Sequence, residues 1–107
     1  MSLEKNLRIS RLFDEYCEVL SENQKRVMTQ YYFEDKTLTE IAENLLISRQ
    51  AVLDAIKKSE EKLFEFEQKF GLVEKVEKLQ ELVSKFKSNK ISKHQFVEEI
   101  ENKIKEI

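Results

Sequence analysis

The chain has 107 residues, with 19 basic and 21 acidic side chains, a formal net charge of −2 and a pI of about 5.6. This length suits one compact domain, or a small domain with an appendage. A protein that wraps nucleic acid usually carries a clear basic excess, because phosphate neutralisation dominates its affinity, so the balance argues against strong nucleic-acid binding by a monomer. A local basic patch could still bind nucleic acid.

The composition predicts an all-α fold. The chain contains no proline and one glycine, Gly71, and its residues are 37 % charged and 40 % hydrophobic. No apolar run approaches the roughly 18 residues that span a bilayer. Glu4, Lys5 and Arg8 interrupt any signal-peptide core near the start. With a single cysteine there is no internal disulfide, and we expect a cytoplasmic protein without a membrane span.

The residues suggest no catalytic or metal chemistry. Cys17 lies on an apolar stripe with Phe13 and Leu20, so we expect it to be buried. His94 has no Cys or His neighbour at ligand spacing, which argues against a metal site. Because a glycine-rich phosphate loop and a nucleophile–histidine arrangement are also missing, we expect no cofactor and no enzymatic activity.

The first half of the chain predicts three helices. Apolar spacing predicts one over residues 3–20, whose inward positions include Leu7. Ser21 and Gln24 form a capping-box pattern that starts a second helix, ending near Phe33. A polar turn over 34–36 leads to a short third helix, capped by Thr37 or, in preference, by Thr39. The predicted inward residues of the last two helices are Val27, Met28, Tyr31, Tyr32, Ile41, Ala42 and Leu45.

A turn at Leu46–Ile47 precedes a long fourth helix. Ser48 is its predicted cap, and the helix runs about 22 residues to Gly71, which suits a left-handed residue just past a helix end. One face carries apolar residues at spacings close to a heptad seam: Val52, Ile56, Leu63, Phe66 and Phe70. We expect its first half to belong to a helix-turn-helix and its second half to project from it.

The residues after Gly71 predict two further amphipathic helices. The first carries apolar positions from Leu72 to Phe86, and the second follows a break at 88–90 and is capped by Ser92. We therefore predict a helix-turn-helix domain over 1–70 and a helical appendage over 71–107 that packs on the fourth helix or on another copy. The unpartnered stripes favour a homodimer.

The third and fourth helices have the residue types that a helix-turn-helix needs. Ala42 is small enough for a close crossing, and the aliphatic residues around it fix the crossing angle. The turn position commonly filled by glycine is Leu46, which costs about 1 kcal/mol if the backbone is left-handed there. The motif is strong as a structural signal.

The candidate nucleic-acid contacts lie mainly at the start of the fourth helix. Arg49 suits guanine, Gln50 suits adenine, and Lys57 and Lys58 suit phosphates. The full predicted set is Ser48, Arg49, Gln50, Leu53, Lys57 and Lys58, with Lys25 and Arg26 as further backbone contacts.

Acidic neighbours oppose this interpretation. Glu40, Glu43 and Asp54 line the same region, and residues 21–62 hold seven basic against eight acidic side chains. Arg49, Lys57 and Lys58 also fit an ordinary solvated helix face. We expect the aromatic run from Tyr31 to Phe33 to belong to the core and not to stack on bases.

The segment Leu20–Leu63 is similar to region 4 of bacterial sigma factors, and nearly the whole chain resembles the YlxM family of small bacterial proteins. The most specific pieces are YYFED (31–35), TEIAE (39–43), SRQAV (48–52) and LFEFEQKFGL (63–72). YlxM-type genes typically neighbour those for the signal-recognition-particle GTPase and its receptor. The resemblance therefore implies a regulatory part in protein targeting, with components of that particle as partners.

Two functions stay open from the sequence. One is a regulator that binds DNA or RNA as a dimer. The other is a protein–protein adaptor that binds the targeting GTPase without nucleic-acid contact. Their salt dependence should differ, because phosphate contacts weaken steeply with salt.

Overall fold

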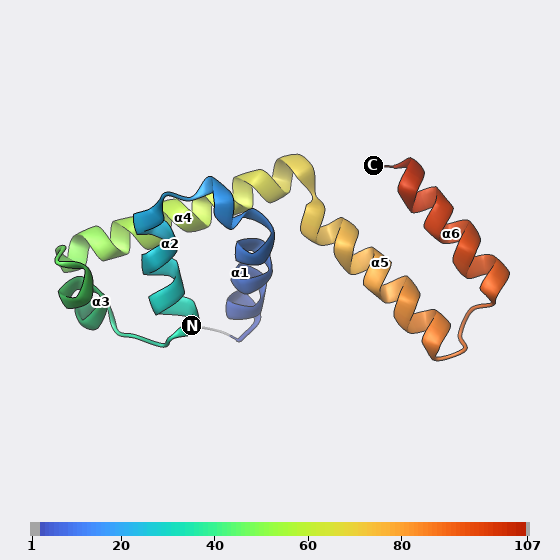
Figure 1. Ribbon diagram of the computed structural model, residues 1–107, viewed down its shortest axis with the longest axis horizontal. Helices are drawn as coiled ribbons and strands as arrows, with labels where there is room; N and C mark the ends of the chain where they lie inside the picture. Colours follow the sequence, from blue (N-terminus) through green and yellow to red (C-terminus); the bar gives the residue numbers. More distant parts are fainter. Residues whose placement is uncertain (1–2, 107) are drawn as a thin grey trace. The chain divides into compact units, whose positions relative to one another are not determined.

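The computed structural model describes residues 3–106, and within them it is all α-helical apart from short 3₁₀ and π segments and loops (Figure 1). The predicted all-α fold class is thereby confirmed. No described helix is both long and apolar enough to cross a membrane. The chain divides into two compact units, Met1–Phe70 and Gly71–Ile107. The elements are α1 (Leu3–Tyr16), η1 (Cys17–Val19), α2 (Glu22–Met28), η2 (Thr29–Phe33), α3 (Leu38–Leu45), α4 (Arg49–Phe70), α5 (Leu72–Lys87) and α6 (Lys93–Lys105).

The core of the first unit forms along α4, against which α1, α2 and α3 all pack. Val52, Ile56 and Leu63 face inward as predicted. Ser59 is also fully buried and fills the heptad position between Ile56 and Leu63. The apolar pattern missed Ser59 because a hydroxyl does not count as hydrophobic. The buried apolar residues of this unit are Ile9, Leu12, Tyr16, Leu20, Val27, Met28, Tyr32, Ile41, Ala42, Val52, Ile56 and Leu63.

The second half of α4 does not stand alone, which corrects the expectation that it projects from the domain. The Tyr16 hydroxyl donates a hydrogen bond to Glu67 Oε1 over 2.6 Å, and both residues are buried. Lys62 Nζ donates to the carbonyl of Val19 over 3.3 Å. The amphipathic α1 needs an apolar surface to cover its own stripe, and the second half of α4 supplies it.

Several local predictions were wrong in detail. The helix predicted over 3–20 ends at Tyr16 and continues as a 3₁₀ turn, while the second helix becomes π-helical after Met28. Leu7 is 52 % exposed instead of inward. Cys17 is only half-buried, because it lies in the 3₁₀ turn and not on the α-helical stripe. Helical periodicity cannot register such changes of pitch near helix ends.

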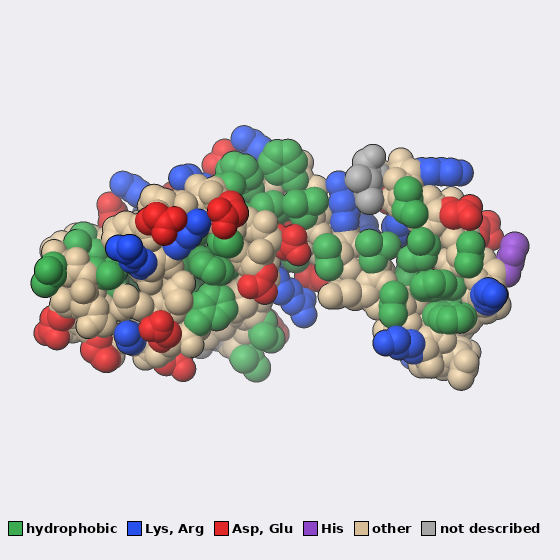
Figure 2. Space-filling model, viewed as in Figure 1, with side chains coloured by type: hydrophobic (Ala, Val, Ile, Leu, Met, Phe, Trp, Pro, Cys, Tyr) green, Lys and Arg blue, Asp and Glu red, His purple; other side chains and the backbone are tan. Residues whose placement is uncertain are grey.

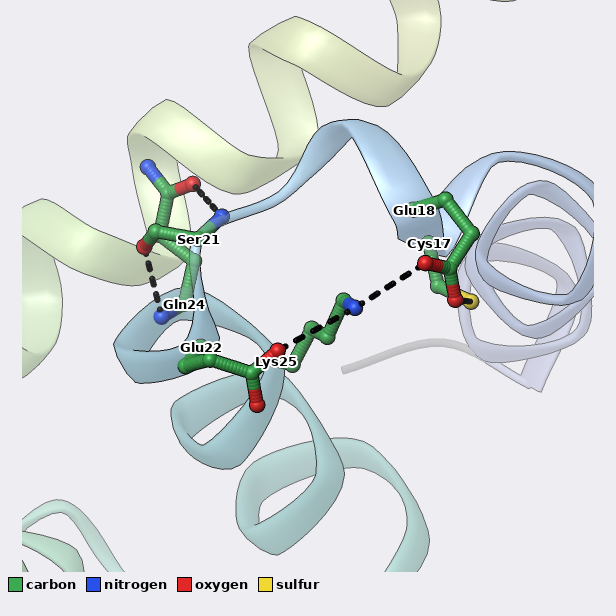
Figure 3. Close-up of polar contacts among 6 residues, drawn as sticks. All are labelled: Cys17, Glu18, Ser21, Glu22, Gln24 and Lys25. Atoms are coloured by element: carbon green, nitrogen blue, oxygen red, sulfur yellow. Dashed lines mark hydrogen bonds and ion pairs between the residues drawn. The ribbon is translucent and has the colours of Figure 1, made fainter.

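Side-chain caps fix where the helices begin. At α2, the backbone N–H of Gln24 donates to Ser21 Oγ, and the backbone N–H of Ser21 donates to Gln24 Oε1 of the side chain. These two bonds form the predicted capping box (Figure 3). At α3, Thr37 makes the same reciprocal pair with Glu40, over 3.1 and 3.2 Å. The preference for Thr39 was therefore wrong, because the capping glutamate stands three residues after Thr37.

A left-handed residue lies at each end of α4, before its cap and after its last residue. Leu46 has φ 57° and ψ 44°, and the Ile47 amide donates to the Ala42 carbonyl over 3.1 Å, which closes the turn between α3 and α4. Ser48 then caps α4 by accepting from the Ala51 amide over 3.0 Å. Gly71 has φ 61° and lies between α4 and α5. Both turns occur where the sequence predicted them.

The second unit is a hairpin of α5 and α6, which pack on each other. Phe86 of α5 stacks on Phe96 of α6, with ring centroids 4.9 Å apart and planes 22° apart. Ser92 caps α6 by accepting from the Gln95 amide over 3.1 Å. Hydrophobic side chains remain visible over both helices (Figure 2), so this unit keeps much apolar surface exposed.

Candidate nucleic-acid interface

The crossing of α3 and α4 exposes the start of α4. Ile41 and Ala42 on α3 and Val52 on α4 are buried. Because a helix turns about 100° per residue, the positions around Val52 that face away from α3 point to solvent. Gln50 and Leu53, the latter 38 % exposed, lie on that side, whereas Ser48 and Arg49 lie one turn before Val52 and are exposed at the start of the helix.

Arg49, Gln50 and Lys57 are uncommitted polar side chains on this surface. All three are exposed. Within residues 3–106, none of the three side chains takes part in a hydrogen bond or an ion pair. Their donors are therefore available to a ligand without the loss of an internal contact.

Lys58 differs from its neighbour Lys57. Its Nζ lies 3.3 Å from Asp54 Oδ2, one helical turn earlier, and both side chains are exposed. Such a pair is worth about 0–1 kcal/mol in water, so it is easily broken. While it lasts, it cancels one of the positive charges predicted for phosphate contact.

Lys25 is engaged elsewhere. Its Nζ lies 3.4 Å from Glu18 and 3.5 Å from Glu22 (Figure 3). Desolvation favours the neutral amine, but the two carboxylates outweigh it and raise the pKa of Lys25. Arg26 is exposed. Among the described residues, no hydrogen bond or ion pair joins Lys25 or Arg26 to the exposed side chains of α4.

A groove of about 390 Å³ opens along one side of α4, between it and residues of α1 and η2, and we call it the α4 groove. Three of the predicted residues, Gln50, Leu53 and Lys57, line it. The other lining residues are Lys5 of α1, Tyr31 of η2, and Asp54, Ile56 and Glu60 of α4.

Sequence reasoning missed Lys5 and Tyr31. Tyr31 was assigned to the core, but it is only half-buried, whereas Tyr32 is buried as predicted. The π-helical pitch of η2 rotates its residues around the helix axis relative to an α-helix. No pattern in the sequence predicts this change. Lys5 comes from a distant part of the chain.

A polar network fixes one wall of the groove. The Tyr32 hydroxyl donates a hydrogen bond to Glu60 Oε1, and Lys5 Nζ lies 3.6 Å from the other oxygen of that carboxylate. Burial, with the adjacent Glu60, raises the pKa of Tyr32 well above its usual value. The network connects α1, η2 and α4, and it leaves Glu60 compensated.

The charge around the site is mixed. The sequence up to Phe70 holds eleven basic and fourteen acidic residues. Glu40 and Glu43 are exposed on α3. The Thr37 amide and hydroxyl, bonded to Glu40, keep the pKa of that carboxyl below its usual value. Figure 2 shows acidic and basic side chains interspersed over the first unit on the face in view. A basic patch here is therefore local and small.

The described part of the chain has no group of three or more His, Cys, Asp or Glu side chains arranged to hold a metal ion. His94 Nε2 lies 3.8 Å from Glu98, one turn further along α6. This contact is fully accounted for as a surface pair on a helix.

Comparison with known proteins identifies the family. The family UPF0122, described as "Putative helix-turn-helix protein, YlxM / p13 like", matches residues 3–104. A UPF0122 protein of Halalkalibacterium halodurans is 46 % identical over 85 residues, which cover 79 % of this chain and 78 % of that protein. A UPF0122 protein of Bacillus cereus and one of Bacillus anthracis have the same identity, covering 79 % of this chain and 77 % of theirs. The chain therefore belongs to the UPF0122 family of YlxM/p13-like helix-turn-helix proteins.

Proposed function

We propose that this protein is a regulator that binds nucleic acid through the exposed face of the first half of α4. The observation that carries the proposal is the uncommitted set of Arg49, Gln50 and Lys57 on a helix whose opposite face is locked into the core. A rigid element with free donors loses little entropy when it binds.

Each side chain has a chemical role in this proposal. Arg49 can donate a bidentate pair to guanine, and Gln50 can donate to and accept from adenine. Lys57 supplies a positive charge for a phosphate. Ser48 caps the helix and leaves Arg49 and Gln50 in its first turn, where the helix dipole favours an anion.

The resemblance to the YlxM family supports a place in the signal-recognition-particle pathway, in the cytoplasm. That particle includes an RNA as well as a GTPase, so the nucleic acid in the proposal is either DNA or RNA. Components of the particle are the partners that this proposal expects.

We further propose that two copies associate through the second unit. On α5, apolar residues follow a regular heptad spacing at Leu72, Val76, Leu79, Val83 and Phe86. Val83 is 39 % exposed and Val97 of α6 is 44 % exposed. Two hairpins that bury these stripes together would form a four-helix bundle, and the dimer would double the number of phosphate contacts.

The proposal is tested by a pair of double variants with equal charge change. Arg49→Ala with Lys57→Ala should abolish the shift of a labelled nucleic acid in a gel, with little change in Tm. Lys87→Ala with Lys90→Ala, on exposed positions of the second unit, should retain the shift. Equal affinities for the two variants would remove the assignment to α4.

An adaptor function is the second candidate, and the acidic surface of α3 favours it. Between residues 34 and 43 the chain carries four acidic and one basic side chain. Such a surface repels phosphate but suits a basic face of a protein such as the targeting GTPase. Two results together would favour the adaptor. The protein should capture that GTPase, and the double variant Glu40→Lys with Glu43→Lys should lose this affinity. The protein should also capture no nucleic acid at low salt.

A further inference from the structure

We propose that the α4 groove receives an unpaired nucleotide of a single strand, and not the edge of a base pair in a duplex. This inference rests on the proposed nucleic-acid function and names the form of nucleic acid that the site takes. It assigns Tyr31 and Lys5, which lie outside the predicted contact set, to the same site.

The shape of the surface is the first argument. A helix that reads a duplex protrudes into the major groove, which is about 12 Å wide. Here the surface is hollowed between Gln50, Leu53 and Lys57 on one side of α4 and Tyr31 and Lys5 of the neighbouring elements. A concave surface fits a ligand that projects from its own backbone, as an unstacked base does in a single strand.

The lining is the second argument. Leu53 and Ile56 provide apolar surface, and the half-buried ring of Tyr31 lies beside them. That ring packs edge-to-face on Tyr32, with centroids 5.1 Å apart and planes 86° apart, so its orientation is held before a ligand arrives. An aromatic ring fixed beside an apolar surface is the usual platform for a base.

The charges are the third argument. Both acidic side chains of the groove are compensated, Glu60 by Lys5 and Tyr32, and Asp54 by Lys58. Lys57 has no ion pair within residues 3–106. The lining therefore offers one free positive charge for a phosphate, and the Gln50 amide for the edge of a base.

Fluorescence anisotropy of the full chain with a labelled strand tests this inference. We expect a short single strand to bind more tightly than the same strand annealed to its complement, in DNA, in RNA or in both. Tyr31→Ala should weaken the single strand by roughly 5- to 150-fold, the loss typical of one stacked base. Tyr31→Phe keeps the ring and should stay close to the wild type.

Two further variants protect the test against misfolding, since Tyr31 also contacts Tyr32. Leu53→Glu places a negative charge in the groove from an exposed position and should abolish single-strand binding while circular dichroism is unchanged. Lys57→Ala should lower the slope of log affinity against log salt by about 0.7. Lys87→Ala removes the same charge at an exposed position of the second unit and should lower that slope less.

The outcomes separate this inference from the proposed function. Tighter binding of the duplex, or single-strand binding that is insensitive to both Tyr31→Ala and Leu53→Glu, would overturn the groove assignment and leave nucleic-acid binding intact. No binding of either form at low salt would overturn the proposed function itself, and the groove assignment with it.

Discussion

In the described part of the first unit, twelve apolar side chains are buried, ten of them on its four α-helices, whereas in the described part of the second unit only Val73 and Leu82 reach that degree of burial. The first unit also has polar contacts between distant segments, such as Tyr16 with Glu67. The second unit is a two-helix hairpin, and two amphipathic helices alone cannot enclose a core. The difference suggests a division of labour, in which the first unit presents a rigid ligand surface and the second presents an apolar surface for association.

The largest expected effect concerns the core of the first unit. Leu63→Ala should lower the free energy of unfolding by about 2–5 kcal/mol, because it empties a fully buried position on α4. Urea denaturation measures the loss. Val83→Ala, on a side chain 39 % exposed in the second unit, is the control. Measured at a protein concentration low enough for the monomer to dominate, it should change stability by less than about 0.5 kcal/mol. Equal losses would refute the contrast between the two units.

The second prediction concerns association of the second unit. Light scattering at micromolar concentration should give twice the chain mass of 12.8 kDa. Val83→Glu with Val97→Glu should restore the monomer mass, because like charges would be buried across the two-fold axis. Lys87→Glu, which changes charge at an exposed position beside the stripe, should leave the dimer intact. A wild-type monomer would contradict the role given to this unit.

The third prediction concerns the start of α3. Thr37→Ala should cost about 0.5–2 kcal/mol, because the Glu40 amide loses its cap. Thr39→Ala is the matched control at an exposed position inside the helix, and it should be close to neutral. Thermal unfolding of the two variants compares them directly, and a larger loss at Thr39 would contradict the observed cap.

The fourth and smallest effect is a pH dependence. The pKa of Tyr32 is higher in the folded protein than its unfolded value near 10, so the unfolded chain loses this proton first as pH rises. The stability that Tyr32 contributes is thus complete below pH 10 and declines above it. Tyr32→Phe should show a flatter decline in the same range by denaturant titration. Identical slopes would contradict the burial of the Tyr32 hydroxyl and its contact with Glu60, which together raise its pKa.

Much of this fold could be predicted from local patterns, and the failures have identifiable causes. Most helix caps and turns were predicted correctly, because capping and turn signals act within a few residues. They include those at Ser21 and Gln24, Leu46, Ser48 and Gly71. The buried Ser59 could not be predicted, since its burial is set by the helices that pack on α4 and not by its own polarity.

The sequence predicted the residues that α4 contributes to the candidate site, but not those from α1 and η2. Helical periodicity identified Gln50, Leu53 and Lys57 as facing away from the core. Lys5 and Tyr31 complete the groove from other elements, and their approach depends on tertiary packing and on the π-helical pitch of η2. The ion pairs that occupy Lys25 and Lys58 likewise follow from side-chain geometry.

The most direct test of the account follows amide chemical shifts of the isotope-labelled full chain during titration with a short single strand. We predict that the perturbed amides cluster at Gln50, Leu53, Lys57 and Tyr31, and that those of α6 stay unchanged. Perturbations concentrated around Glu40 and Glu43, or along α5 and α6, would contradict the central claim that the outer face of α4 contacts nucleic acid.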